Sequence, residues 1–205
     1  MEIEVYLTFV LATTVLILLP GPSVMLTVAH SLSFGVRAAL MTVAGTTLAI
    51  VLQLLITALG MTSVLLVVAE WFDVLRWGGV LYLIYLGIGQ WRAGGEAAKG
   101  DALAEVSPRS LFWHGFVVSA TNPKSLFFYV AFFPQFIDAG ADPAFQLSVL
   151  CLTFLVIAAV LTAGYAILAG QVRGWFQGSR ERLRNRLAGT LLIGAGIGLA
   201  LVRRS

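Results

Sequence analysis

The sequence predicts an all-α integral membrane protein with six transmembrane helices, arranged as a 3+3 inverted repeat in which helices 1 and 4 are broken by proline. Three observations predict this class. Of the 205 residues, 59% are hydrophobic and only 11% are charged, whereas a soluble domain has roughly 25% charged residues. The charges form clusters between long uncharged stretches, and prolines interrupt two of these stretches. This pattern is typical of spanning helices joined by loops.

Charge-free windows define three helices in the first half of the chain. No Asp, Glu, Lys or Arg occurs in residues 5–30, which form the first predicted helix. The next such window, 38–69, exceeds the roughly 20 residues that one span needs. We therefore expect a second helix that ends near Gly60 and a short interfacial piece after it. The stretch 74–92, "VLRWGGVLYLIYLGIGQWR", is the third predicted helix.

The second half predicts three more helices, over residues 111–136, 143–170 and 187–203. The stretch "SATNPKSLFF" interrupts the first of these, as "LLPGPSVM" interrupts the first helix of the chain. Pro22 and Pro123 lie 101 residues apart, each in the first helix of its half, and in both halves a long and then a short charge-free window follow. This order indicates an internal duplication.

A polar, Gly- and Ala-rich stretch, "RAGGEAAKGDALAEVSPR", lies at the middle of the chain. It predicts three parts: residues 1–92 as the first three-helix repeat, 93–109 as a cytoplasmic linker, and 110–205 as the second three-helix repeat. Because three is an odd number, the second repeat enters the membrane from the opposite side. The result is an inverted repeat of the kind that secondary transporters use.

Lysine and arginine in the loops predict the orientation. One side of the predicted membrane collects Arg37, Arg92, Lys99, Arg109, Arg173, Arg180, Arg182, Arg184 and Arg186. The other side holds Arg76, Arg203 and Arg204. We therefore expect the basic loops in the cytoplasm and both termini outside. The formal net charge of +3 reflects this asymmetry and gives no reason to expect a nucleic-acid partner.

The two helix breaks predict a polar pocket. Asn122 is a good helix cap and Pro123 suits the first helical position, so a half-helix is expected to begin at "NPK". Gly21 and Pro22 can start a half-helix in the same way. Each such N-terminus offers unpaired N–H groups and about half a positive charge to an anion such as an amino-acid carboxylate. Exposed backbone is tolerated within a membrane only where it lines a protein cavity.

Two polar side chains near the breaks have two interpretations each. Lys124 is costly in a spanning helix and should face the interior; it either holds an anionic group or carries a proton, or it pairs with carbonyls that the helix break frees. Gln53 shares a helix face with Thr46 and either lines the same cavity or makes interhelical hydrogen bonds. His30 and His114, near the cytoplasmic ends of their helices, are expected to be wet interfacial residues.

The remaining candidate features have structural interpretations. Cys151 is the only cysteine, which excludes an internal disulfide, a CxxC redox pair and a cysteine zinc site; no metal or cofactor is expected. Gly194 and Gly198 make a GxxxG pattern, and further glycines lie on the third predicted helix. These glycines predict close helix packing within the chain, the alternative being the face of a homo-oligomer.

Several motifs resemble the LysE/RhtB amino-acid exporter family along nearly the whole chain. They are "PGPS" followed by "SLSFGVRAAL", then "YLIYLGIGQWRAG", "TNPKSLFFYVAFFPQFI" and "GYAILA". The resemblance implies a proton-driven secondary exporter of amino acids or their derivatives in a bacterial inner membrane, and it points to the residues of the two breaks. With Ser23 of "PGPS" and Gln53 added, the predicted substrate-binding residues are Pro20, Gly21, Pro22, Ser23, Gln53, Asn122, Pro123 and Lys124.

One departure from this family concerns the choice of substrate. Relatives often carry an acidic residue about six positions before the "GY" pair, where this chain has Ala158. Without an intramembrane carboxylate, a cationic substrate such as lysine is disfavoured. A neutral amino acid of the homoserine, threonine or leucine type is expected. The aromatic residues that follow the second break agree with this; they are Phe127, Phe128, Tyr129 and Phe132.

A transporter for a small amino-acid substrate, embedded in the lipid bilayer, is therefore the predicted function. Two alternatives from other classes are an intramembrane enzyme and a non-transporting scaffold. An enzyme needs a nucleophile with a base or a metal, and no such group of residues lies at the expected membrane depth. A scaffold would not explain a lysine and two helix breaks at related positions.

Overall fold

The computed structural model describes residues 1–92, 107–138, 140–176 and 181–201, and within these ranges it is helical with no strand. The helices in chain order are α1 (Ile3–Leu18), α2 (Pro22–Phe34), α3 (Val36–Arg92), α4 (Pro108–Ala120), α5 (Pro123–Phe132), η2 (Phe133–Phe136), α6 (Pro143–Arg173), η3 (Gly174–Phe176) and α7 (Glu181–Ala200). An all-helical fold was the prediction, and the structure confirms it.

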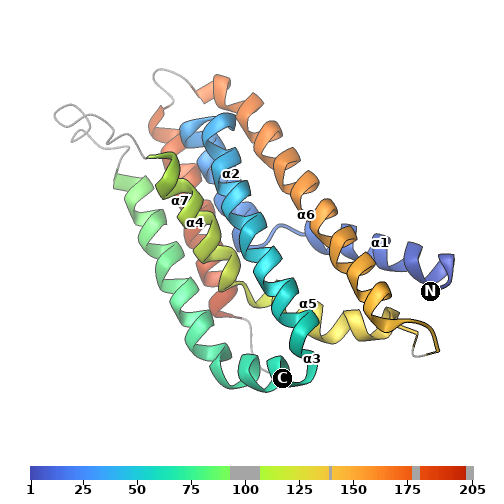
Figure 1. Ribbon diagram of the computed structural model, residues 1–205. Coiled ribbons are helices and arrows are strands. Elements are labelled where there is room, and N and C mark those ends of the chain that lie inside the picture. The colour runs from blue at the N-terminus through green and yellow to red at the C-terminus, as the bar shows by residue number, and fades with distance from the viewer. Residues whose placement is uncertain (93–106, 139, 177–180, 202–205) are drawn as a thin grey trace.

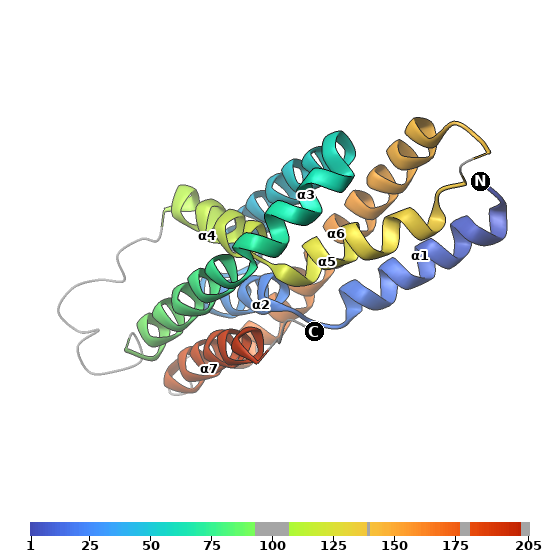
Figure 2. The same ribbon diagram turned by 90° about the horizontal axis from the view of Figure 1, so that it is seen from below.

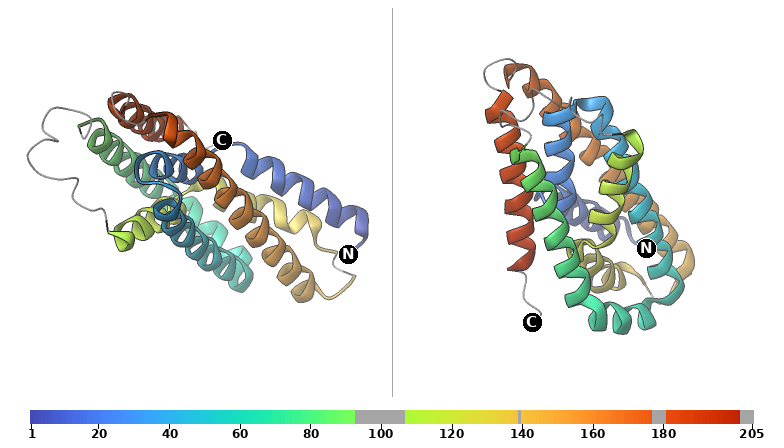
Figure 3. Two further views of the ribbon diagram at one scale, coloured as in Figure 1. Left: turned by 90° about the horizontal axis from the view of Figure 1, so that it is seen from above. Right: turned by 90° about the vertical axis from the view of Figure 1, so that its left-hand side faces the viewer.

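The helices form one elongated bundle (Figure 1). At its upper end in that view, α2 passes into α3 and α6 ends; at its lower end α3 turns back and α5 leads into α6. The N-terminus lies beside the connection from α5 to α6 when the bundle is seen from below (Figure 2) and from above (Figure 3). The Tyr6 hydroxyl shares a hydrogen bond of 3.1 Å with Thr153 Oγ1, which ties α1 to α6 there.

The outer surface of the bundle is apolar, as the bilayer requires. On α1, the residues Leu7, Leu11 and Val15 recur every four positions and are each at least half exposed. Such a stripe on a soluble protein would mark a binding or aggregation surface. Two described helical segments, Val36–Ala58 and Pro143–Arg173, are long and apolar enough to cross a membrane, and α1 with α2 makes a third if the bent pair counts as one span.

The second and third predicted helices differ from the structure. Helical hydrogen bonding continues from Val36 to Arg92, and the ribbon of α3 turns back at the lower end of the bundle instead of breaking (Figure 1). No proline occurs between residues 58 and 92, so no backbone donor is missing there. The expected interfacial piece is therefore part of one bent helix.

Glycines permit two close helix contacts. A Cβ on Gly45 of α3 would lie 1.9 Å from the carbonyl oxygen of Phe112, and one on Gly115 of α4 would lie 2.2 Å from that of Thr42. Near the other end of α3, Gly87 faces Gly189 of α7 in the same manner, because a Cβ on either would come within 3 Å of the other's carbonyl oxygen. The helix backbones touch at both places.

The GxxxG expectation is not met in the form predicted. A Cβ on Gly194 or Gly198 would meet no described atom within 4 Å, so these glycines make no close contact within the described chain. The alternative, that they face a second copy, stays a prediction. The four-residue spacing of the GxxxG pattern could not identify Gly189 as the α7 glycine that contacts α3.

A cluster of aromatic side chains fills the part of the bundle where α1, α5, η2 and α6 meet. This aromatic cluster consists of Phe9, Phe128, Tyr129, Phe133, Phe136 and Phe154, each at most 8% exposed. Its rings contact one another edge to face, with Tyr129 and Phe154 centroids 4.9 Å apart and Phe9 and Phe133 centroids 5.3 Å apart. Edge-to-face pairs are a favoured aromatic geometry. The cluster is a dry, closely packed region.

Candidate functional site

Both predicted helix breaks are present and have the same local form. α1 ends at Leu18 and α2 begins at Pro22, with Gly21 as its N-cap, and the two helices meet at 53°. α4 ends at Ala120 and α5 begins at Pro123. In each case a proline occupies the first helical position, where its missing N–H has no intrahelical partner to lose. The sequence therefore starts a new half-helix at each break.

The two breaks lie next to each other. The Asn122 side chain caps α5 by accepting a hydrogen bond of 3.1 Å from the Lys124 backbone N–H. Its Nδ2 also donates to Ser23 Oγ on α2 at 3.3 Å. On the same side, a Cβ on Gly21 would lie 3.4 Å from Lys124 Cδ. One amide side chain thus joins the start of α5 to the start of α2.

Lys124 neutralises the open end of α1. Its Nζ donates to the carbonyl oxygen of Leu16 at 2.6 Å and to that of Leu19. The Tyr165 hydroxyl of α6 donates to the neighbouring carbonyl, Leu18, at 2.9 Å. The last carbonyls of a helix have no partner within it and carry partial negative charge. The structure therefore shows the pairing with freed carbonyls, and the role of Lys124 in holding an anion or carrying a proton stays a prediction.

A cavity of about 50 Å³ lies at this junction. It is large enough for only a few waters, because one water needs roughly 10–15 Å³ measured in this way. Its walls come from α1, α2, α3, α4, α5 and α6. The lining residues are Leu16, Ile17, Leu19, Gly21, Ser23, Val24, Thr46, Ile50, Ser119, Asn122, Lys124, Ser125, Phe154, Ala158 and Thr162. Hydroxyl, amide and ammonium groups thus share the lining with aliphatic and aromatic groups.

The cavity brings together four of the predicted site residues, Gly21, Ser23, Asn122 and Lys124. The three predicted prolines of the site, Pro20, Pro22 and Pro123, belong to the breaks but are not part of the lining.

Gln53 is not part of the lining either. Its Nε2 donates to the carbonyl oxygens of Ser119 and Ala120 at 3.0 and 3.2 Å. Of its two interpretations, the structure shows interhelical hydrogen bonding, which holds α3 against the last turn of α4. Its Oε1 is buried without a hydrogen-bond partner in the described part of the chain.

Sequence reasoning missed the contributions of α4 and α6 to the cavity. Ser119 immediately precedes the second break, and Ala158 and Thr162 lie one helical turn apart on α6. A polar residue four positions from a small one in an otherwise apolar helix is the signal that could have identified this face. Ala158 therefore lies in the cavity wall, and α6 contributes no carboxylate to the lining.

Fold and cavity together define a class, the helical membrane translocators: apolar helices surround a polar cavity formed where two broken helices meet. The model of the family described as "LysE type translocator" matches residues 14–203. The chain belongs to this LysE family.

Several relatives are named as efflux proteins. The homoserine/homoserine lactone efflux protein of Salmonella typhimurium is 33% identical, with all of both chains covered. The leucine efflux protein of Klebsiella pneumoniae is 29% identical over 97% of this chain and 95% of its own. An uncharacterized membrane protein of Vibrio cholerae is 31% identical over 99% of this chain and its own full length. No solved structure matches the chain.

Proposed function

We propose that this protein exports neutral amino acids or their derivatives, of the homoserine, threonine or leucine type, from the cytoplasm across a bacterial inner membrane. Export is driven by the proton gradient. The observation that carries the proposal is the cavity at the junction of the two breaks, where half-helix N-termini, hydroxyl groups and one ammonium group converge. The names of the efflux relatives support the substrate class.

The proposal includes an architecture of six spans in two inverted repeats, residues 1–92 and 110–205. The similar local form of the two breaks supports it. Most of the proposed linker, 93–109, lies outside the described residues.

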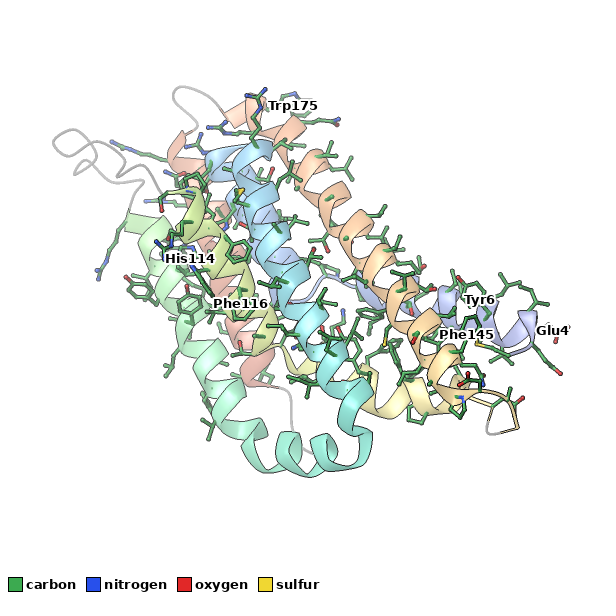
Figure 4. The ribbon with its side chains drawn as sticks, viewed as in Figure 1. Glu4, Tyr6, His114, Phe116, Phe145 and Trp175 are labelled. Atoms are coloured by element: carbon green, nitrogen blue, oxygen red, sulfur yellow. The ribbon has the colours of Figure 1, made fainter. Side chains whose placement is uncertain are left out.

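The proposed orientation places both termini outside. Arg37 is the second residue of α3, Arg92 is the last residue of α3, and Arg173 is the last residue of α6. These helix ends lie at the end of the bundle where Figure 4 labels Trp175. Glu4 is labelled at the opposite end. This distribution supports a cytoplasmic position for the end with the arginines.

Substrate recognition follows from the charge at the half-helices. The N-terminus of α2 presents Ser23 and Val24 to the cavity, and its partial positive charge suits a carboxylate. Phe154, Ile50 and Ile17 provide the apolar wall for a neutral side chain. A cavity of about 50 Å³ is too small for an amino acid, so binding requires the helices around it to separate.

Counterflow in liposomes tests the transport function. Purified protein is reconstituted into liposomes loaded with unlabelled homoserine, threonine, leucine or lysine, and uptake of the same labelled amino acid is followed without a pH gradient. We expect counterflow of one or more of the neutral amino acids. If no amino acid on the panel exchanges, the proposal of transport is wrong and a scaffold is favoured.

A carboxylate at position 158 is expected to change the substrate preference. Because Ala158 lines the cavity, the Ala158→Asp variant places an acidic group where a cationic substrate side chain can pair with it. A charge-assisted hydrogen bond of about 1.5 kcal/mol corresponds to roughly tenfold in affinity. We therefore expect lysine counterflow relative to leucine to rise by about that factor.

The matched control for this change is Ala158→Ser, which adds a polar group without charge and should leave the preference neutral. An Ala158→Asp variant that exchanges leucine and lysine in the wild-type ratio would show that position 158 does not contact the substrate side chain.

A further inference from the structure

A row of buried polar side chains leads from the cavity toward the end of the bundle that carries the arginines. On α2, Ser23 lines the cavity, Thr27 follows four positions later and donates to the Ser23 carbonyl oxygen at 2.9 Å, and His30 follows after three more. Residues at this spacing share one helix face. On α3, Thr46 lines the cavity and Thr42 lies one turn further along the row.

The row ends at a pair of histidines. His30 of α2 and His114 of α4 have ring centroids 5.5 Å apart. His30 is only 2% exposed, so it is a buried residue and the expectation of a wet interfacial position is wrong for it. Figure 4 labels His114 on α4, in the half of the bundle that also holds α2.

Each histidine has a hydroxyl partner on one ring nitrogen. His30 Nδ1 and Thr42 Oγ1 share a hydrogen bond of 2.7 Å, and His114 Nε2 and Ser110 Oγ share one of 3.1 Å. His114 Nδ1 is buried and has no partner in the described part of the chain. A hydroxyl can accept from an imidazolium or donate to a neutral ring. Both hydroxyls therefore suit either protonation state, and one nitrogen remains open to a proton.

The groups around the pair leave it free of a neighbouring carboxylate in the described residues. From α3, Tyr82 contacts His114 edge to face at 6.0 Å. From α7, the buried Arg184 lies at the same end of the bundle and its Nε donates to Asn185 Oδ1 at 3.3 Å. From α6, Arg173 donates to the Ser33 carbonyl oxygen at 3.4 Å. Within the described residues, the ring contacts of the pair with titratable groups are the one with Tyr82 and the one between the two histidines.

We propose that His30 and His114 together bind the proton that is exchanged for the substrate. This inference rests on the proposed transport function. The proton passes from a hydronium ion in the cavity to a ring nitrogen, which leaves water and an imidazolium. On the arginine-bearing side the imidazolium returns the proton to water, and the neutral ring is restored. The hydroxyl groups of the row between Ser23 and Thr42 provide hydrogen-bonding positions along this path.

The geometry limits the pair to one proton at a time. Two imidazolium rings at 5.5 Å in a site away from water would repel each other strongly. A single imidazolium, in contrast, has an acceptor in the hydroxyl of its own Thr42 or Ser110 partner. The lining of the cavity has no carboxylate in the described residues, and the ammonium group of Lys124 is bonded to carbonyl oxygens. The histidine pair therefore provides the titratable site that proton coupling needs.

The test separates proton coupling from transport. Wild type, His30→Gln and His114→Gln are reconstituted, and each is assayed for counterflow without a pH gradient and for accumulation driven by a pH gradient. We expect the wild type to do both. Each histidine variant should keep counterflow and lose accumulation, because exchange of substrate for substrate needs no proton.

The Thr42→Val variant removes the hydroxyl partner of His30 and keeps both rings. Its matched control is Thr47→Val, because the Thr47 hydroxyl donates to the Val43 carbonyl oxygen of its own helix at 2.8 Å. We expect the first variant to shift the pH dependence of driven accumulation and the second to leave it unchanged. A shift in neither variant would argue against a proton on His30.

A second measurement does not depend on variants. The chain has only two histidines, so ¹⁵N-histidine labelling of wild-type protein, purified with a tag free of histidine, reports on this pair alone. As the pH is lowered in a titration of the labelled protein, we expect one ring per protein to become protonated before the other. This decides the matter even if the histidine variants lose counterflow through misfolding.

Three results would overturn the proposal. Retained pH-driven accumulation in both histidine variants would place the proton site elsewhere. Counterflow without any pH-driven accumulation in the wild type would leave the transport function in place and remove the role of the pair. Two independently protonated rings, or none, would exclude a shared proton. Absence of wild-type counterflow, by contrast, would contradict the transport function itself.

Discussion

Replacing Lys124 with methionine is expected to abolish counterflow and to lower the melting temperature of the protein in detergent. The ammonium group is bonded to the carbonyl oxygens of Leu16 and Leu19, both at the open end of α1. Methionine keeps the unbranched chain but leaves these acceptors without their donor. The bond to Leu16 is only partly buried and the one to Leu19 is exposed within the chain. A hydrogen bond to a charged group contributes about 1.5–3 kcal/mol, so the loss of the two bonds should lower stability measurably.

The loss of transport has a separate cause. Lys124 is the contact that joins the start of α5 to the end of α1 across the cavity, so its removal also changes the electrostatic field at the proposed carboxylate site. Counterflow by reconstituted protein and melting in detergent are measured on the same preparation. Lys124→Arg, which retains a cation with several donors, should recover more stability than transport, because its planar guanidinium presents these donors in a different geometry from the ammonium group.

Tyr165→Phe is the matched control, since it frees only the Leu18 carbonyl and changes no charge. A smaller loss of stability with retained counterflow is expected there. Wild-type stability and counterflow in Lys124→Met would show that neither the carbonyl bonds nor the charge at this position is needed.

Adding one methyl group at the contact between α3 and α4 is expected to prevent normal folding. In Gly115→Ala the new Cβ would lie 2.2 Å from the carbonyl oxygen of Thr42, and in Gly45→Ala it would lie 1.9 Å from that of Phe112. Both obstacles are backbone atoms, so no change of rotamer relieves the clash and the helices must separate. The cost should exceed the 1–3 kcal/mol or so that overpacking usually costs.

Separation of α3 from α4 also disturbs the site. Thr46 Oγ1 donates to the Gly115 carbonyl oxygen at 3.4 Å, and Gln53 donates to the carbonyls just beyond. Yield of monodisperse protein in detergent and its melting temperature are the measurements. We expect little monodisperse protein from either variant.

The matched controls are Gly78→Ala and Gly194→Ala, where a Cβ meets no described atom within 4 Å. Alanine is favoured over glycine in a helix by about 1 kcal/mol, so these variants should be as stable as the wild type or slightly more stable. Normal yield and stability of Gly45→Ala and Gly115→Ala would contradict the packing of α3 on α4.

Local chemistry made the two breaks predictable. Proline at a first helical position after glycine or asparagine is a short-range signal, and it located the starts of α2 and α5 to the residue. The same signal predicted that Gly21, Ser23, Asn122 and Lys124 gather around one cavity, as they do.

Features that depend on contacts between helices could not be obtained in this way. The hydrogen bonds of Lys124 to the carbonyls of α1, and of Gln53 to the carbonyl of Ser119, depend on how closely α1 and α4 approach those side chains. The close contacts of Gly45 with Phe112 and of Gly115 with Thr42 join residues that are far apart in the sequence, and no periodic pattern predicts them. The charge-free windows of the sequence also did not predict that α3 bends without a break in its helical hydrogen bonding.

Some predictions concern residues outside the described part. These include Lys99, Arg180, Arg203 and Arg204 of the charge pattern and the side chain of Phe127 after the second break. Phe128, Tyr129 and Phe132 of the same aromatic run are described, and the first two are buried in the aromatic cluster.

The aromatic cluster has a consequence for the leakage of protons across the membrane. Its rings adjoin the cavity through Phe154 and pack closely between α1, α5, η2 and α6. Protons cross apolar regions rapidly only along continuous chains of water, and closely packed rings interrupt such a chain. For the proposed exporter, this cluster would therefore slow the leak of protons through copies that carry no substrate.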